Sequence, residues 1–117
     1  MALPTLRRQK DIASFYTIAQ RFRLPGVTLL LAPSPDGALR FLIVAGRKVG
    51  GAVVRNRVRR RLRAMLQEVS PELEGDWWIG LIAGPSFVDI SSSEALARLR
   101  QVLRRAGALG GEQPDDR

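Results

Sequence analysis

Apolar side chains recur at the spacing of an α-helix in residues 11–22. The residues at positions i, i+3, i+4, i+7 and i+10 are Ile12, Phe15, Tyr16, Ala19 and Phe22, which form an apolar stripe. Asp11 would complement the positive N-terminal end of a helix dipole, and Pro25-Gly26 would end the helix. The pattern therefore predicts a first helix over 11–22.

A second helical pattern begins after Gly50-Gly51 and stops at Pro71. Its apolar positions span about 120° of the helix circumference, and they are Val54, Val58, Leu62, Met65, Leu66 and Val69. Five polar residues lie about 100° to 260° from Val58, and they are Asn56, Arg57, Arg59, Arg60 and Arg63. One side of this helix is predicted to pack on the core, while the other side is cationic.

A third helix is predicted to end at about Gly107. Ser91 followed three residues later by Glu94 is a capping-box pattern. The apolar stripe of the helix consists of Leu96, Leu99, Leu103 and Ala106. We expect a single domain over 1–107, and a disordered acidic tail over 108–117 because that segment is rich in glycine, proline and acid.

Three apolar stretches predict strands. Residues 27–32 and 38–45 flank the turn residues of 33–37, so we expect them to pair as an antiparallel hairpin. Residues 77–83 are almost continuously apolar, which predicts a strand buried on both faces. The order α-β-β-α-β-α indicates the α+β class, an α/β sandwich built on a small mixed sheet.

Composition narrows the possible chemistry. The 117 residues suit one small domain, and the chain has no cysteine and no histidine. Zinc sites, disulfides, thiol nucleophiles and histidine acid–base catalysis are therefore excluded, and the acids show no paired spacing for a protein active site. The apolar runs are too short to span a bilayer and no signal peptide is evident, so we expect a cytoplasmic protein without membrane association.

The net charge of +8 is concentrated in one segment. Residues 47–63 contain eight basic residues and no acid, whereas the rest of the chain has 11 of each sign (19 − 8 = 11 basic, 11 acidic). Such a single-sign segment favours a polyanionic partner, although a GC-rich genome would also enrich arginine. A membrane surface is disfavoured because the opposite helix face is needed for the core. Nucleic acid is the preferred partner.

RNA is preferred to duplex DNA because aromatic side chains accompany the basic helix. Phe15, Tyr16 and Phe22 could stack on unpaired bases, but an aromatic stripe at helical spacing more often packs in a core. Gly50-Gly51 would permit close approach of a phosphate to the backbone at the helix start, and would equally suit an ordinary turn.

The segment 46–66, GRKVGGAVVRNRVRRRLRAML, resembles the bacterial ribonuclease P protein component. The matching motifs are Arg47-Lys48-Val49-Gly50, Ala52-Val53, Arg55-Asn56-Arg57 and Arg59-Arg60-Arg61-Leu62-Arg63. The resemblance implies a left-handed β-α-β crossover through the basic helix, an exception to the usual right-handed rule. It also implies a noncatalytic subunit that binds a catalytic RNA and helps it to cleave precursor tRNA, with Mg²⁺ held mainly by the RNA.

The same resemblance implies two sets of binding residues. Those expected to meet the RNA subunit are Arg47, Lys48, Arg55, Asn56, Arg57, Arg59, Arg60 and Arg63. Those expected to line a cleft for the single-stranded 5′ leader are Ile12, Tyr16, Thr28 and Leu30. This chain departs from the family pattern at Ile12, where phenylalanine is more usual, at Gly51 in place of asparagine, and at Gly46-Arg47 in place of Ser-Lys.

Two other interpretations remain at this point. A noncatalytic structural RNA-binding protein, such as a ribosomal protein, would also carry a basic helix on a small sheet. A self-sufficient nuclease would need acid–base groups that the sequence does not pair. We predict no protein partner, and the sequence does not define a metal site.

Overall fold

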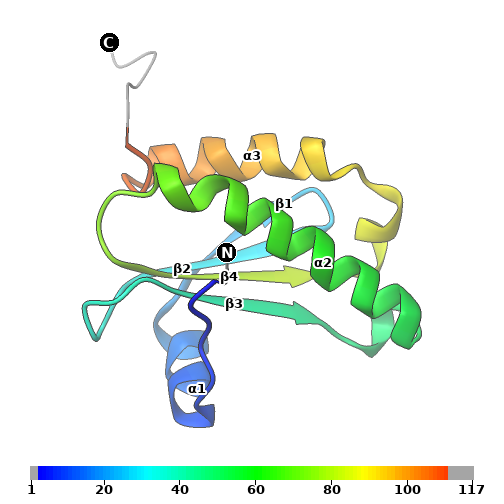
Figure 1. Cartoon of the computed structure of the whole chain (residues 1–117), viewed down its shortest axis with the longest axis horizontal. Helices are drawn as coiled ribbons and strands as arrows, with labels where there is room; N and C mark the ends of the chain where they lie inside the picture. The colour runs from blue at the N-terminus through cyan, green and yellow to red at the C-terminus, as the bar shows by residue number, and fades with distance from the viewer. Residues whose placement is uncertain (1–2, 111–117) are drawn as a thin grey trace.

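A four-stranded mixed sheet with helices on both faces organises residues 3–110, the part of the chain that the computed structural model describes (Figure 1). The strands lie in the order β1-β2-β4-β3. The elements are α1 (Gln9–Ile18), β1 (Gln20–Leu24), β2 (Val27–Pro33), β3 (Arg40–Ala45), η1 (Arg47–Val49), α2 (Ala52–Val69), η2 (Ser70–Glu72), β4 (Trp77–Ala83), η3 (Pro85–Asp89) and α3 (Ser92–Arg105). The predicted α+β class with a small mixed sheet is confirmed.

The almost continuously apolar strand β4 occupies the interior of the sheet. It pairs antiparallel with β2 and parallel with β3. Trp78 is buried on one face, and Ile79 and Leu81 are buried on the other. The predicted hairpin between 27–32 and 38–45 is therefore wrong, because β4 lies between these two strands and satisfies the backbone groups of both.

The connection from β2 to β3 crosses the beginning of β4. The Asp36 carboxylate accepts hydrogen bonds from Ser34 Oγ at 2.8 Å, Arg40 Nε at 2.8 Å and Trp78 Nε1 at 3.2 Å. The bonds from Ser34 and Arg40 hold the pKa of Asp36 well below its usual value of 3.8. Their contribution to stability is complete above that value and is lost as the pH falls toward the lowered pKa.

The first predicted helix is shorter than expected, because residues after Ala19 form strand β1. Phe22 and Leu24 point toward the main core and alternate with Arg21 and Arg23, which is the period of a strand. Pro25-Gly26 is the turn of a β1–β2 hairpin, with Leu24 paired to Val27. Phe22 fitted the helical stripe by spacing alone, and pairing with β2 overrides that pattern.

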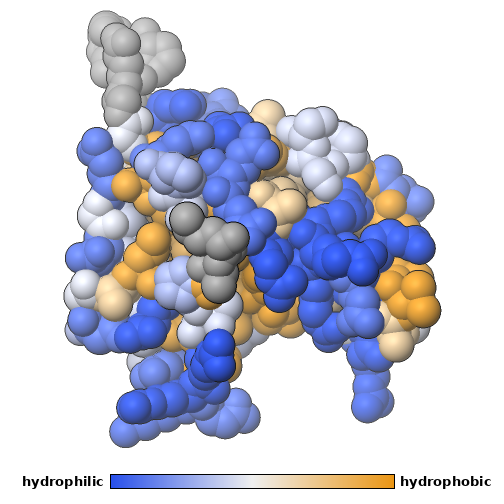
Figure 2. Space-filling model, viewed as in Figure 1, coloured by the Kyte–Doolittle hydropathy of each residue, from blue (hydrophilic) through white to orange (hydrophobic). Residues whose placement is uncertain are grey.

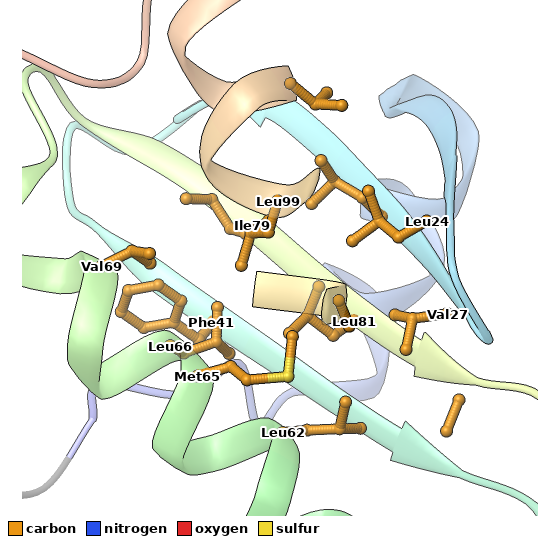
Figure 3. Close-up of a cluster of buried hydrophobic side chains, with 14 of the residues drawn as sticks. Leu24, Val27, Phe41, Leu62, Met65, Leu66, Val69, Ile79, Leu81 and Leu99 are labelled. Carbon is orange, nitrogen blue, oxygen red and sulfur yellow. The ribbon is translucent and has the colours of Figure 1, made fainter. Parts of the chain in front are cut away.

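The connection β3–α2–β4 is left-handed, as the resemblance implied. In Figure 1 both parallel strands run from left to right, β4 lies above β3, and α2 passes in front of the sheet between them. The main core lies beneath α2 and α3, where Leu62, Met65, Leu66 and Val69 of α2 meet Phe41, Ile79 and Leu81 of the sheet (Figure 3). The crossover fixes which face of α2 remains in solvent.

Helix α1 packs on the opposite face of the sheet through Phe15, which is fully buried. Phe15 meets Trp78 edge to face, with ring centroids 5.9 Å apart. Gly80 lies beneath the Phe15 ring, and a Cβ at that position would be 3.0 Å from Phe15 Cε2. The missing side chain of Gly80 is thus what lets α1 rest directly on the sheet.

We expect Gly80→Ala to destabilise the protein by about 1–3 kcal/mol, because the added methyl group overpacks the α1 contact. The midpoint of urea unfolding measures this change. Gly37→Ala is not a suitable control, because the φ of Gly37 is 73° and any side chain at that φ would strain the backbone. Ala13→Gly is the better comparison. Ala13 is exposed on α1, so this change makes the helix less stable without altering the contact between Phe15 and Gly80. An unfolding midpoint unchanged by Gly80→Ala contradicts this account.

The chain remains ordered beyond the predicted end of the domain. Ala108 and Leu109 are buried in the main core, and Leu109 forms a β-bridge with Leu73. The prediction of a disordered tail is therefore wrong for 108–110, because these apolar side chains fill the end of the core. The remaining tail, 111–117, lies outside the described residues.

Candidate nucleic-acid interface

Helix α2 separates apolar and cationic side chains as its periodicity predicted. Val58, Leu62 and Leu66 are buried beneath it. Hydrophilic side chains gather over the outer surface of α2 in Figure 2, in front of the sheet. We define the α2 surface as six exposed polar residues of η1 and the first three turns of α2, namely Arg47, Lys48, Asn56, Arg57, Arg60 and Arg63.

No carboxylate in residues 3–110 forms an ion pair with a cation of the α2 surface. The two acids nearest the end of α2 are engaged elsewhere. Arg100 of α3 lies 2.9 Å from Glu72 and 3.7 Å from Glu68. The positive charge of the α2 surface is therefore concentrated and is not balanced locally, which suits an extended polyanion.

The two remaining predicted RNA contacts, Arg55 and Arg59, are half-buried. Arg59 Nη1 donates to Asn56 Oδ1 at 3.0 Å, so these two side chains are held as a unit at the edge of the α2 surface. Arg55 Nε is buried and has no hydrogen-bond partner among the described residues. Arg59 Nη2 also donates to Ala45 O at 3.4 Å, and in both guanidinium groups some of the five N–H donors are not used by bonds within residues 3–110.

Arg61 is different, because it points inward and fastens α2 to the segment before α3. Its guanidinium donates to Phe87 O at 2.8 Å, to Ile90 O, and to Ser92 Oγ through Nε at 2.8 Å. It also lies 3.8 Å from the centroid of the Phe87 ring, and burial lowers its pKa from the usual value. One of the eight cations in the basic segment is therefore structural.

We expect Arg61→Met to destabilise the protein by about 2–4 kcal/mol, because the carbonyls of Phe87 and Ile90 lose charged donors. Chemical denaturation measures the loss. Arg60→Met removes the same charge from an exposed neighbour and is the matched control. If the two variants unfold at the same denaturant concentration, Arg61 is not the structural tie described above.

Gly50 has a structural explanation in the turn before α2. Its φ is 151°, and a Cβ there would be 2.9 Å from Val54 Cβ. A Cβ at Gly51 would meet no atom within 4 Å. The sequence left two interpretations of this pair, an ordinary turn and close approach of a phosphate. The turn accounts for Gly50, while Gly51 leaves the start of α2 open to solvent.

A second candidate surface lies on the α1 side of the sheet. The register places Arg23, Thr28, Ile82 and Val44 side by side across the four strands. The last three are only half-buried, and Ile12 and Tyr16 of α1 border them. We call this region the α1 cleft, and its residues are Ile12, Tyr16, Thr28, Val44 and Ile82.

Three of the four predicted cleft residues lie at the α1 cleft, and one does not. Ile12, Tyr16 and Thr28 are partly exposed, but Leu30 is fully buried beneath α1. Leu30 lies on the same face of the sheet as Thr28, as predicted. Phe15 covers it, however, so it cannot touch a ligand in this structure. Ile82, which we did not predict, takes its place because the register sets it beside Thr28.

The Tyr16 ring is also near a cation. Arg21 of β1 lies on the same face of the sheet, with its guanidinium carbon 5.9 Å from the ring centroid. A hollow of about 280 Å³ beside them is lined by Arg21, Phe22, Arg23 and Thr28. Apolar, aromatic and cationic side chains that neighbour one another on one surface are suited to unpaired nucleotides.

Neither surface contains a candidate metal centre in the described part of the chain. Residues 3–110 hold no group of three or more acidic side chains placed to bind a metal ion. None of the described helices is long and apolar enough to cross a membrane.

The family of the chain follows from a sequence comparison that covers nearly all of this fold. The family model for ribonuclease P matches residues 3–107. The chain belongs to the ribonuclease P protein family. This match includes α2, the α1 cleft and α3, so the two surfaces described above are parts of a ribonuclease P protein.

Individual relatives agree with this assignment. The ribonuclease P protein component of Microcystis aeruginosa is 32% identical over 119 residues, covering 95% of this chain and 99% of the relative. That of Symbiobacterium thermophilum is 38% identical over 104 residues, covering 89% and 88%. The solved RNase P protein of Staphylococcus aureus shares the fold with a TM-score of 0.77 at 18% identity, covering 93% of this chain and all of that one.

Proposed function

We propose that this ribonuclease P protein is the noncatalytic subunit of a ribonucleoprotein that matures the 5′ end of tRNA. In this proposal the α2 surface binds the catalytic RNA, and the α1 cleft binds the 5′ leader of precursor tRNA. The observation that carries the proposal is the unbalanced positive charge of the α2 surface in a member of this family. We also propose that the protein works in the cytoplasm.

The α2 surface would bind RNA chiefly through phosphates. Arginine presents several donors in a planar fork that matches phosphate oxygens, and each neutralised phosphate releases condensed counterions. The Asn56–Arg59 pair supports this role, since one member orients the other before RNA arrives. Because the apolar side of α2 is buried, the helix would bind as a rigid body.

The α1 cleft would bind single-stranded RNA by stacking and by charge. Tyr16 offers a partly exposed ring, Thr28 and Ile82 form the floor, and Arg21 stands over the ring to meet a phosphate. Such a surface accepts most sequences, because every base has a flat face to stack. A leader of variable sequence fits this chemistry.

We assign the bond-breaking step to the RNA subunit with Mg²⁺ held mainly by that RNA. The chain has no histidine or cysteine to serve as general base or nucleophile. Asp36, the carboxyl with the most strongly lowered pKa, is bound to Arg40 and Trp78 in a turn. The lack of histidine and cysteine, and the structural role of Asp36, support the role of a binding subunit.

Cleavage of precursor tRNA by the cognate RNA at low Mg²⁺ tests the proposal. Added protein is expected to stimulate cleavage, and the protein alone is expected to cut nothing. Absence of stimulation contradicts the assignment to this complex. Cleavage by RNA-free protein contradicts the noncatalytic role. Co-purification with ribosomal RNA, identified by sequencing, would favour a structural RNA-binding protein.

Replacing Tyr16 with alanine is expected to weaken binding of precursor tRNA to the reconstituted complex about fivefold or more, because one stacked base is worth about 1–3 kcal/mol. Mature tRNA without a leader should bind as before. Thr17→Ala is the control, since Thr17 lies on the exposed side of α1. Equal losses for both RNAs contradict a role of Tyr16 in leader binding.

A further inference from the structure

A third cationic surface lies where the edge strand β1 meets α3. A hollow of about 380 Å³ is lined there by Arg23, Arg98 and Arg105 together with Gln20, Phe22 and Val102. We call it the β1–α3 hollow. It has three arginines and no acid in its wall, and it is formed by elements outside the basic segment 47–63.

The three arginines are not neutralised within the described chain. None forms an ion pair with a carboxylate of residues 3–110, and Arg98 Nη1 instead donates to Gln101 Oε1 at 2.8 Å. Glu94 lies one turn before Arg98 and does not reach it. A cation in the last turn of a helix is favoured by the helix dipole, which accounts for Arg105 but not for Arg98 or Arg23.

The β1–α3 hollow adjoins a smaller hollow that reaches Thr28 of the α1 cleft. Phe22 and Arg23 line the β1–α3 hollow and also the smaller hollow beside Thr28. Arg21, next in the same strand, stands over the Tyr16 ring. Positive charge therefore runs from Tyr16 across the outer edge of β1 to Arg98 and Arg105.

We propose that the β1–α3 hollow binds the part of a single-stranded RNA leader that extends beyond the α1 cleft. The inference rests on the proposed function, since it gives the same leader a second contact. Phosphates would meet Arg23, Arg98 and Arg105, and the half-buried Phe22 ring would offer an apolar surface to a base. Leaders that end inside the α1 cleft would gain nothing from it.

The test compares two precursor tRNAs that differ only in leader length, each bound to the reconstituted protein–RNA complex. One leader ends within the α1 cleft and the other extends well beyond it. The double variant Arg98→Ala, Arg105→Ala is expected to weaken binding of the long-leader substrate about tenfold and to leave the short-leader substrate unchanged. Its log–log salt dependence for the long leader should become shallower by about 1.4, or about 0.7 for each lost contact with a single strand.

Two controls accompany the double variant. Arg98→Lys, Arg105→Lys keeps both charges and should retain most of the long-leader affinity. Arg7→Ala removes one exposed charge beside β3, at the opposite edge of the sheet, and should show no dependence on leader length.

Equal weakening of both substrates overturns the inference, because it assigns these arginines to the catalytic RNA or the tRNA body. Unchanged binding of both substrates by a folded double variant overturns it as well. Failure of the proposed function is distinguishable, since the unmodified protein would then fail to bind or stimulate with either leader.

Discussion

Leu62→Asp is expected to leave the protein unfolded at neutral pH. Leu62 is fully buried between α2 and the sheet, and its neighbours in the core are apolar. An unpaired carboxylate at this position would cost several kcal/mol in addition to the lost packing, against a total stability of about 5–15 kcal/mol for a typical domain. Far-ultraviolet circular dichroism measures the loss of helix and strand.

The matched variant is Ala64→Asp, two residues away on the exposed side of the same helix. It introduces the same charge and should keep the native spectrum. A folded Leu62→Asp variant would mean that α2 does not pack as described, and the orientation of the whole α2 surface would then be wrong.

The double variant Arg57→Ala, Arg60→Ala is expected to fold normally and to bind the catalytic RNA about tenfold to a hundredfold more weakly. Both side chains are exposed on the α2 surface and form no ion pair with the described acids. Filter binding at several salt concentrations is the measurement. The log–log slope should decrease by about 0.9 for each lost phosphate contact.

Arg57→Lys, Arg60→Lys is the charge-preserving comparison, and it should recover the salt slope more fully than the affinity, because lysine lacks the bidentate fork. Unchanged affinity and unchanged slope in the alanine variant would show that the α2 surface does not face RNA.

Helix α2 could be predicted closely from the sequence because its structure is determined by local periodicity. Val58, Leu62 and Val69 repeat at helical spacing, and the same residues are buried in the structure. The arginines between them could only be placed in solvent. The capped start of α3 is equally local, since Ser91 Oγ accepts from the Glu94 N–H at 3.1 Å.

The sheet order could not be predicted, because it depends on contacts between residues far apart in the chain. The turn residues at 33–37 are compatible with a hairpin. In the structure, however, β4 pairs with β2 on one side and with β3 on the other, so β2 and β3 are not neighbours. Strand β1 was missed for a related reason. Its alternation covers only Gln20–Leu24, which is short beside the preceding helical stripe.

For the two surfaces as well, local periodicity could be used in prediction, whereas contacts between distant residues could not. Arg61 lies about 300° from Val58 on a helical projection, next to the apolar stripe, and this position was the available sign that it points inward. Its partners Phe87 and Ile90 are far along the chain, so their carbonyls could not be anticipated. The burial of Leu30 likewise follows from where α1 lies, which strand alternation alone does not give.

The two main surfaces lie on opposite sides of one sheet, since α2 packs on one face and α1 on the other. The sheet and the side chains buried on its two faces therefore separate the two surfaces. In the proposed function, the sheet would therefore keep the phosphates of the catalytic RNA and of the leader on opposite sides of the protein, which weakens their mutual repulsion. Substitutions on the two sides should then be additive in free energy, as expected for sites without shared neighbours.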